Sequence, residues 1–415
     1  MVWIKRKKGK YLLIFENLTN LLLIKDIGMI PYIFQRIVDF KSSILTYKDV
    51  NNYPYLKEFC NGLELEFLKR KKWLNKINRY ERPIISYLIK NSKNIDILEL
   101  FHLTNQALLY AFLYKLLNRN GFVYIKLDEW FYIKYHNKIR PNNYPYFRYN
   151  ERLNSLNQIK NKIRNIVGRK VSKYAIKKLN LLSIETKALF DEIKDYPRIK
   201  NKVIYLPNGI DDIQVKDLGI KRLSFSEKKN IILTVGTIGW EPKGHQILLN
   251  ALTKINDLKN WQFYLIGQIR PEFQEVIRNF YKDNPSLKDK VFFTGGIYDR
   301  RKLLEYYQKS KIFCFPSIME SFGVVLVEAG YFGNYIVSSD IPSARDITKN
   351  GTLGKLFKAS DSDELANILD YLMNHEEIIR DNCPKIQDHI DNNFLWSIIV
   401  SKLYREIIKR RKLKI

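Results

Sequence analysis

The chain has 415 residues, and its 46% hydrophobic content is enough for packed domains and excludes a wholly disordered protein. A net charge of +28 favours anionic partners: nucleic acid, lipid headgroups or phosphorylated substrates. No zinc-finger, RNP or helix-turn-helix pattern accompanies the charge, so a membrane surface is preferred and nucleic acid is ranked below it. An AT-rich genome that favours lysine codons is the alternative explanation of the charge.

Three widely separated cysteines, Cys60, Cys314 and Cys383, have no metal-like spacing and predict a reducing compartment. The apolar stretch 107–117 is too short to span a bilayer and contains Lys115, and the first residues do not form a signal peptide. We therefore expect a cytoplasmic protein. No cluster of His, Cys or Asp suggests a metal site.

Short apolar runs divide the chain into predicted strands. In the first half they lie at 11–15, 42–47, 95–101, 122–127, 179–184 and 202–206, and a Tyr-, Asn- and Pro-rich irregular segment covers 130–150. In the second half they lie at 231–236, 261–267, 291–295, 311–317 and 335–339, each before a segment with helical spacing. Apolar strands that alternate with helices predict an α/β protein with parallel sheets covered on both faces. We expect two Rossmann-like doubly wound domains, 1–206 and 207–385, and a helix in 386–415 that packs back on the first domain.

A glutamate lies within an apolar run at 317–330, SIMESFGVVLVEAG. The preceding strand and Gly323 predict a helix that begins near Gly323, whose N-terminus would be a site for an anion such as phosphate. Glu328 would lie in the first turns of this helix, and a buried carboxylate needs a partner. The partner is either a pair of vicinal ribose hydroxyls or a lysine from a neighbouring helix. Glu320 lies in the loop before the helix and can face the same cleft.

A second candidate motif is VGTIGWEPKGHQILLNAL, residues 235–252. Gly236 directly follows a strand, and Lys243 and Gly244 precede the next helix, so Lys243 can reach a diphosphate at the carboxyl edge of the sheet. His245 is expected to be a cap or a surface residue. In Asp361-Ser-Asp363, which spells a metal motif of another fold, the acids are expected to cap a helix.

These motifs occur in order with YLPNGID (205–211), FYLIG (263–267), VFFTGGI (291–297) and YIVSSDIPSARDI (335–347). Together they resemble the nucleotide-sugar half of the retaining, family 4 glycosyltransferases, over residues 203–375. The resemblance implies a GT-B fold, in which two Rossmann-like domains face a cleft. It also implies that Glu328 binds the donor ribose, that Glu320 contacts the transferred sugar and that Lys243 neutralises the diphosphate. The implied donor-binding residues are Gly28, Gly236, Thr237, Lys243, Gly295, Gly296, Ile297, Glu320, Ser321, Phe322, Gly323, Val324 and Glu328.

The sequence departs from the family pattern at two places. Thr237 occupies the position where the family often has an arginine, so the diphosphate charge would rest more on Lys243. In the first domain, where the resemblance is weaker, Leu127 and Asp128 replace the family's His-Asp pair. His102 or Asp128 would stand in for the missing histidine as catalytic residues, and a structural role for His102 is the alternative. Gly28 remains from the family's glycine-rich first loop.

The expected function is retaining transfer of a sugar from a nucleotide-diphosphate sugar, with a UDP-sugar as co-substrate and without a cofactor or metal. The acceptor would be a saccharide, first of all a lipid-linked one, which would place the protein on the inner face of the cell membrane as a peripheral protein. Two alternatives remain: a non-catalytic GT-B partner subunit that binds nucleotide, glycan or protein, and a basic nucleic-acid-binding protein.

Overall fold

The computed structural model describes residues 9–38, 40–47, 53–69, 81–128 and 155–412, so the segment 130–150 lies outside the described residues. The chain forms two compact units. Unit 1 takes the chain up to Asn208 together with the residues from Ile399 onward, and unit 2 takes Gly209–Ile398.

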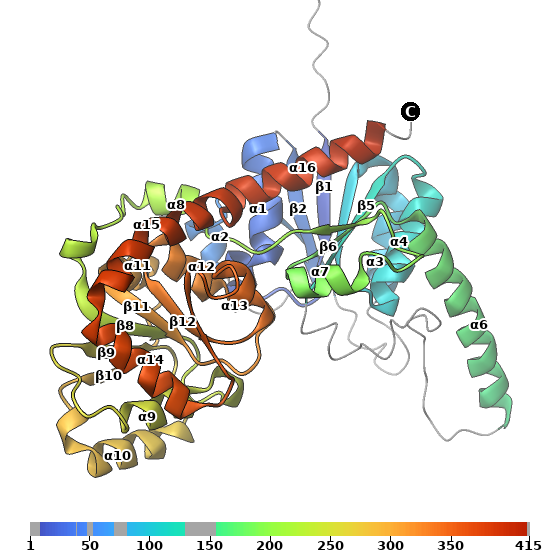
Figure 1. Ribbon diagram of the computed structural model, residues 1–415. Helices are drawn as coiled ribbons and strands as arrows, with labels where there is room; N and C mark the ends of the chain where they lie inside the picture. The colour runs from blue at the N-terminus through green and yellow to red at the C-terminus, as the bar shows by residue number, and fades with distance from the viewer. Residues whose placement is uncertain (1–8, 39, 48–52, 70–80, 129–154, 413–415) are drawn as a thin grey trace, which may run out of the picture. The chain divides into compact units, whose positions relative to one another are not determined.

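Unit 1 is built on a parallel sheet with the strand order β3-β2-β1-β4-β5-β6-β7 (Figure 1). Its described strands are β1 (Lys10–Ile14), β2 (Lys41–Tyr47), β3 (Glu64–Leu68), β4 (Ile97–Phe101), β5 (Phe122–Leu127), β6 (Leu181–Ile184) and β7 (Val203–Tyr205). The predicted parallel α/β architecture is confirmed. β3 was not predicted because its sequence, ELEFL, alternates polar and apolar residues at the edge of the sheet, where only part of the strand is covered.

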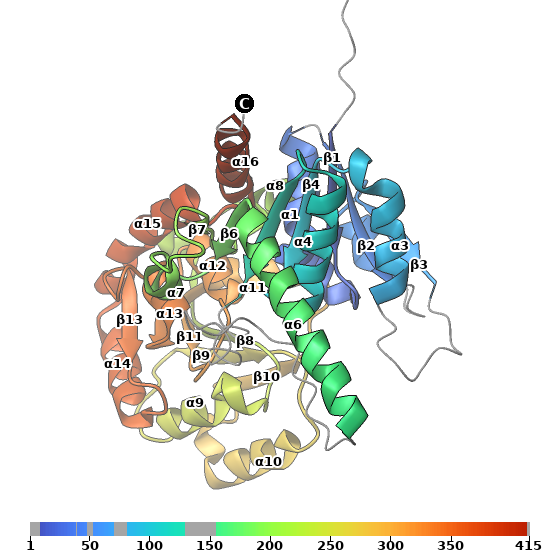
Figure 2. The same ribbon diagram turned by 90° about the vertical axis from the view of Figure 1, so that its right-hand side faces the viewer.

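Helices cover both faces of this sheet. One face packs against α3 (Glu81–Asn91), α4 (Asn105–Leu117), α6 (Ser155–Lys178) and α7 (Lys187–Ile193), and α4 and α6 lie side by side (Figure 2). The opposite face is covered by α1 (Asp26–Val38), where the rings of Tyr11 and Phe34 lie 4.6 Å apart. The smaller described elements of unit 1 are η1 (Asn20–Ile24), α2 (Pro54–Glu58) and η3 (Ser92–Asn94).

Unit 2 has a second parallel sheet, with the order β10-β9-β8-β11-β12-β13. Its strands are β8 (Lys229–Val235), β9 (Gln262–Ile266), β10 (Val291–Gly295), β11 (Ser310–Phe315), β12 (Tyr335–Ser339) and β13 (Gly354–Phe357). β13 is an additional short edge strand that the sequence pattern did not predict. The other strands lie where the apolar runs predicted them.

Alternate residues of the unit 2 strands enter two separate cores. Ile232 belongs to the core under α9 (His245–Leu252), α10 (Phe273–Asp283) and α14 (Ser362–Asn374). Ile231 and Leu233 belong to the core under α11 (Arg300–Lys309), α12 (Val324–Tyr331), α13 (Pro342–Ile347) and α15 (Glu376–Asn393). The shorter elements are α8 (Asp212–Asp217), η5 (Phe225–Glu227), η6 (Glu241–Lys243) and η7 (Pro285–Leu287).

The last described helix, α16 (Trp396–Lys412), belongs to both units. It begins in unit 2, where the Trp396 N–H donates to the Ile210 carbonyl at 3.0 Å and the Trp396 side chain is buried. From Ile399 it belongs to unit 1, where the Tyr404 ring packs edge-on against Phe34 at 5.8 Å. The apolar stripe of this helix is therefore core. Among the described residues, no helix is both long and apolar enough to cross a bilayer.

The α1-covered face of the unit 1 sheet contains buried polar side chains. Glu99 on β4 is fully buried, and it accepts a hydrogen bond of 2.7 Å from the Tyr11 hydroxyl on β1. Burial raises the pKa of Glu99 to about 8, the hydrogen bond from Tyr11 opposes this shift, and the negative charge of Asp26 adds to it. The carboxyl group is therefore largely protonated at neutral pH.

We predict that Glu99 makes unit 1 less stable as the pH rises. Between the ordinary value of 4.5 and about 8, the folded chain keeps the Glu99 proton while the unfolded chain has lost it. The free energy of unfolding therefore falls with increasing pH in this window, by at most about 1.4 kcal/mol per pH unit from this group. Urea unfolding of wild type and Glu99→Gln should be measured at several pH values from 5 to 8.5. The free energy of unfolding of the variant should rise relative to that of wild type as the pH rises, by at most about 1.4 kcal/mol per pH unit. Stability curves that stay parallel would contradict the raised pKa.

Candidate active site

The strand order of unit 2 places a topological switch point, which we call the crevice, at the carboxyl edge of its sheet. β8 is followed in sequence by β9 on one side and is paired with β11 on the other, so the connections that follow β8 and β11 run in opposite directions. Ligands of open parallel sheets bind at such a switch point. Gly236 and Thr237 follow β8, and the segment from Glu320 to Val324 follows β11. The structure thus brings together the two predicted donor-binding motifs.

Backbone contacts fix the two loops to each other. The Ile318 N–H donates to the Pro242 carbonyl at 2.8 Å. Gly244 has a left-handed φ of +64°, and a Cβ atom there would lie 2.0 Å from the Pro316 carbonyl oxygen. Only glycine permits this close approach without a shift of the backbone. The position of Lys243, one residue earlier, is therefore set by the end of β11.

Lys243 and Glu320 form an ion pair across the crevice. The Lys243 ammonium donates a hydrogen bond to Glu320 Oε2, and it also lies 5.4 Å from the centre of the Phe315 ring. Both side chains keep some exposure to solvent, 15% for Lys243 and 19% for Glu320. Each is thus the other's partner in the structure, and a ligand that needs either side chain must compete with this pair.

The segment after β11 leads into the N-terminus of α12. Gly323 is the N-cap of α12 with a φ of +71°, so the predicted helix start is confirmed. The first N–H groups of a helix lack carbonyl partners within it and attract anions. Phe322 is buried, with its ring centre 6.3 Å from that of Phe394, so its side chain serves the core. Ser321 next to it is half-buried.

Glu328 has a protein partner in the structure. Its Oε1 lies 2.7 Å from a terminal nitrogen of Arg300, the first residue of α11, and the two side chains are only 8% and 14% exposed. Burial disfavours the charged guanidinium, but the charge of Glu328 outweighs it and raises the pKa of Arg300. The alternative that a lysine from a neighbouring helix pairs with Glu328 is corrected, because an arginine from a neighbouring helix does so. The contact with ribose hydroxyls stays a prediction. The Arg300 contact engages one carboxylate oxygen of Glu328.

The turn after β10 holds the remaining predicted donor residues of unit 2. Gly295 has a φ of +73°, its carbonyl accepts from the Gly267 N–H at 3.0 Å, and no atom lies within 4 Å of a Cβ placed there. Gly296 and Ile297 follow, and the Tyr298 ring beyond them is 69% exposed. The backbone is therefore open at Gly295, whereas the Tyr298 ring lies against Gly296, 3.2 Å from a Cβ placed there.

In unit 1 the structure brings His102 and Asp128 together. His102 follows β4 with a left-handed φ of +59°, and its N–H donates to the Lys126 carbonyl at 2.7 Å. Its Nε2 lies 3.8 Å from Asp128 Oδ2. Burial lowers the pKa of His102 in spite of the Asp128 charge, so the ring is neutral at neutral pH. Backbone strain of this kind persists where the surroundings enforce it.

Beside this pair lies a buried lysine that sequence reasoning missed. Lys126, at the end of β5, is fully buried, with its ammonium 3.6 Å from Asp26 Oδ2 and 3.8 Å from Glu185 Oε2. Asn208 donates to the same oxygen of Glu185 at 2.9 Å. The signal was present in FVYIKL, because a charge within an apolar strand raises the same question as Glu328. Arg300, in the polar sequence YDRRK, gave no such signal.

Two of the sequence-based interpretations are wrong. Gly28 does not lie in an open loop: it is buried in the first turn of α1, and a Cβ there would lie 2.0 Å from the Leu23 carbonyl oxygen. The glycine is thus explained by close packing of η1 on α1. His245 is neither a cap nor a surface residue, because Gly244 is the N-cap of α9 and His245 is buried. Burial and the charge of Lys243 lower the pKa of His245 to about 4.

The acids expected to cap a helix do not form a metal site. Asp361 is the N-cap of α14 and accepts from the Glu364 N–H at 2.9 Å, as predicted, whereas Asp363 pairs with Lys254 at 2.7 Å. Within the described part of the chain, no group of three or more His, Cys, Asp or Glu side chains is arranged to hold a metal ion.

Residues 216–387 match the family of glycosyl transferases group 1. Over its whole length the chain is similar in structure to Anabaena Alr3699/HepE, solved in complex with UDP, with a TM-score of 0.66, 16% sequence identity and coverage of 97% of this chain and 100% of that one. The chain has the GT-B fold, with a group 1 glycosyltransferase domain in unit 2.

Two curated relatives resemble part of this GT-B chain. It is 26% identical over 204 residues to phosphatidyl-myo-inositol mannosyltransferase of Mycobacterium leprae, which covers 49% of this chain and 52% of the relative. It is 30% identical over 155 residues to GalNAc-alpha-(1->4)-GalNAc-alpha-(1->3)-diNAcBac-PP-undecaprenol alpha-1,4-N-acetyl-D-galactosaminyltransferase of Campylobacter jejuni, which covers 36% of this chain and 40% of the relative. The chain thus spans about half the length of the curated relatives it matches.

We predict that Glu320→Gln tightens the binding of free UDP. The substitution keeps the shape of the side chain but releases the Lys243 ammonium, which is then free to meet the diphosphate. Ion pairs with some exposure are worth up to about 1 kcal/mol, so the dissociation constant should fall by about 2- to 5-fold in calorimetry. Weaker binding of UDP to the variant would show that Glu320 does not hold Lys243 back. Uridine, which lacks the diphosphate, is the matched ligand control and should bind both proteins equally.

Proposed function

We propose that this protein is a retaining glycosyltransferase that moves a sugar from a nucleotide-diphosphate sugar, with UDP-sugar as the first candidate, to a saccharide acceptor. The observation that carries the proposal is the meeting of Lys243, Glu320 and the N-terminus of α12 at one crevice, with Glu328 held by Arg300 behind them. The group 1 family match of unit 2 and the UDP complex of Alr3699/HepE support it.

In the proposed complex the diphosphate lies at the N-terminus of α12, against the N–H groups near Gly323 and Val324. Lys243 leaves Glu320 and meets the diphosphate, and Glu320 turns to the hydroxyls of the transferred sugar. Glu328 keeps Arg300 on one oxygen and accepts from the ribose hydroxyls with the other. The nucleobase lies over the turn of Gly295, Gly296 and Ile297.

In the reaction, the bond between the sugar C1 and the diphosphate oxygen breaks, and the acceptor oxygen bonds to C1 on the same face. The acceptor proton passes to the departing diphosphate oxygen. The protein therefore positions the reactants and stabilises the charge that grows on the leaving group, and a strong general base is not needed. Because Lys243 and the α12 N-terminus supply positive charge here, we propose transfer without a metal, and activity should persist in EDTA.

We propose that His102 and Asp128 face the acceptor at the carboxyl edge of the unit 1 sheet. β1 and β4 form the switch point of this sheet, and His102 directly follows β4. The Nε2 atom of a neutral imidazole can accept a hydrogen bond from an acceptor hydroxyl, and Asp128 Oδ2, 3.8 Å from that nitrogen, can accept from a second hydroxyl. The names of the two curated relatives refer to phosphatidyl-inositol and to an undecaprenol-linked glycan, which supports a lipid-linked acceptor.

A basic helix face supports placement on an anionic membrane surface. In the part of α6 whose side chains are described, Arg169, Lys170, Lys173 and Lys177 are exposed, while Ala175 and Ile176 are buried in unit 1. Exposed lysines and arginines attract anionic headgroups with up to about 1 kcal/mol each.

Substitutions at Glu328 and Arg300 should distinguish a role in nucleotide binding from a role in stability. Glu328→Ala alone leaves a buried guanidinium without its partner, which destabilises unit 2 by about 3–5 kcal/mol. The double variant Glu328→Ala/Arg300→Met removes both charges and should recover most of that stability. It should still bind UDP more weakly than wild type by about 1–3 kcal/mol, because the ribose has lost its acceptor. Calorimetry and urea unfolding on the same samples check both parts.

If the double variant binds UDP as tightly as wild type, Glu328 is a structural residue and the ribose assignment is wrong. Sugar transfer is assayed with the same set of proteins and a panel of nucleotide sugars. Binding of UDP by wild type without transfer or hydrolysis of any sugar donor would favour the alternative of a non-catalytic GT-B subunit.

We predict salt-sensitive binding to anionic vesicles. The protein should co-sediment with phosphatidylglycerol vesicles at low salt, be released above roughly physiological ionic strength, and not bind neutral phosphatidylcholine vesicles. Lys170→Gln/Lys173→Gln/Lys177→Gln should reduce this binding more than three substitutions of exposed lysines in unit 2, for example at Lys216, Lys282 and Lys355. If both triple variants lose the same amount of vesicle binding, the binding depends on the net charge of the protein and not on α6.

A further inference from the structure

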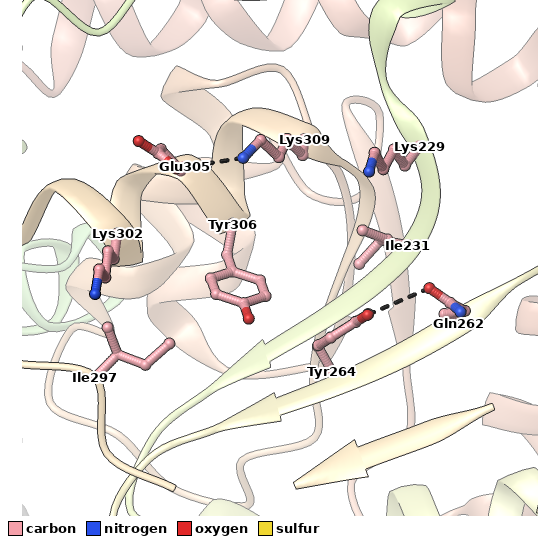
Figure 3. A pocket seen from close by; sticks show the side chains of 9 residues that line it. All are labelled: Lys229, Ile231, Gln262, Tyr264, Ile297, Lys302, Glu305, Tyr306 and Lys309. Carbon is pink, nitrogen blue, oxygen red and sulfur yellow. Dashed lines mark hydrogen bonds and ion pairs between the residues drawn. The ribbon is translucent and has the colours of Figure 1, made fainter. Parts of the chain in front are cut away.

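A pocket of about 420 Å³ lies in unit 2 between α11 and strands β8 and β9 (Figure 3). It is lined by Lys229, Ile231, Gln262, Tyr264, Ile297, Lys302, Glu305, Tyr306 and Lys309. It extends from the carboxyl edge of the sheet, at Ile297, to the opposite edge, where β8 begins with Lys229. The lining does not include the main residues of the donor crevice, Lys243, Glu320, Gly323 and Glu328. Its volume is in the range of small-ligand pockets.

Aromatic side chains form one wall of this pocket. Tyr264 on β9 stacks on Phe292 of β10, with ring centres 5.0 Å apart. Tyr306 on α11 lies at a tilt to Tyr264, with ring centres 5.4 Å apart. Since the Tyr264 ring already has aromatic neighbours at these distances, there is no slot between the rings for a planar base. The rings offer edges and hydroxyl groups instead.

The polar groups of the pocket suit a ligand with hydroxyls. The Tyr264 hydroxyl donates to Gln262 Oε1 at 3.3 Å, which leaves the amide nitrogen of Gln262 as a donor (Figure 3). Tyrosine hydroxyls both donate and accept hydrogen bonds. Ring edges and tyrosine hydroxyls with an amide donor beside them are suited to the hydroxyl rim of a sugar ring.

The charges of the pocket are unequal. Three lysines line it against one carboxylate, Glu305, which pairs with Lys309 at 3.3 Å. Among the described residues, Lys229 and Lys302 have no carboxylate within ion-pair distance. Two ammonium groups therefore remain to balance a negatively charged ligand.

We propose that this pocket binds an acidic saccharide unit, that is, a sugar ring bearing a carboxylate or a phosphate ester, as a site separate from the donor crevice. The tyrosine wall and Gln262 contact the ring and its hydroxyls, and Lys229 and Lys302 meet the negative group. Ile297, at one end, also belongs to the turn proposed to carry the nucleobase, so both ligands would be neighbours without sharing a polar contact. The site does not depend on the proposed transfer activity.

The test is calorimetry or ligand-observed NMR with the full chain, using glucuronate and glucose 6-phosphate as probes and glucose and inorganic phosphate as controls. At least one acidic sugar should bind, and more tightly than either control; the one that binds better identifies the charged group. The same titration in saturating UDP should give the same affinity. Loss of binding in UDP would place the ligand in the donor crevice and overturn the proposal. Equal binding of inorganic phosphate would reduce the site to adventitious anion binding, and no binding of either acidic sugar would also overturn it.

Removing positive charge and removing negative charge from the pocket should change the affinity for the acidic sugar in opposite directions. Lys229→Gln/Lys302→Gln should weaken binding by about fivefold or more, the effect of losing a charged hydrogen-bond partner. Glu305→Gln should strengthen it, because the lone carboxylate is removed and Lys309 is released. Lys355→Gln, an exposed lysine on β13, is the charge-matched control and should leave the affinity unchanged. If Lys355→Gln weakens binding as much as the pocket variant, or if Glu305→Gln weakens it, the assignment to this pocket is wrong.

Discussion

An opposite charge offsets the cost of burying a charged side chain beside a parallel sheet, and each unit of this protein contains a buried ion pair of this kind. In unit 2, Arg300 of α11 holds Glu328 of α12 at 2.7 Å, so one contact fixes both helix starts beside the crevice. In unit 1, Lys126 of β5 lies between Asp26 of α1 and Glu185 after β6. Removing one partner of a buried pair costs far more than the pair itself contributes. The arrangement of the helix starts and strand ends around each crevice depends on these pairs remaining complete.

The two ion pairs near the crevice of unit 2 differ in how deeply they are buried. Arg300 and Glu328 are nearly closed to solvent and act as a fixed element, whereas Lys243 and Glu320 remain partly exposed and can exchange partners. Contacts with the end of β11 hold the backbone at Lys243, because Gly244 lies against the Pro316 carbonyl and the Pro242 carbonyl accepts a hydrogen bond from the Ile318 N–H. A movable side-chain pair on a fixed backbone lets the resting protein keep its charges balanced while presenting them to a ligand.

Most of the fold followed from hydrophobic pattern, and parts of the site did not. Strands buried on both faces were visible as apolar runs, but the edge strands β3 and β13 were not, since ELEFL is half exposed and GKLF is short. Lys243, Glu320 and Gly323 could be placed together because parallel strands put their carboxyl ends on one edge. Which charge would meet Glu328 is decided by how α11 packs on α12, and no local pattern around Arg300 encodes that packing. At Gly28 the motif pattern was misleading. The glycine stands where the family has a glycine-rich loop, but in the structure it is required by its close contact with the Leu23 backbone.

The shared helix α16 has a consequence for the order in which the protein is made. Unit 1 includes residues from Ile399 onward, so the ribosome synthesises part of it only after all of unit 2. Domains generally fold during synthesis as soon as their sequence is available. Unit 2 can therefore complete its core first, while the α1 side of unit 1 still lacks the ring of Tyr404 beside Phe34. During that interval, part of unit 1's apolar surface would be open to chaperones.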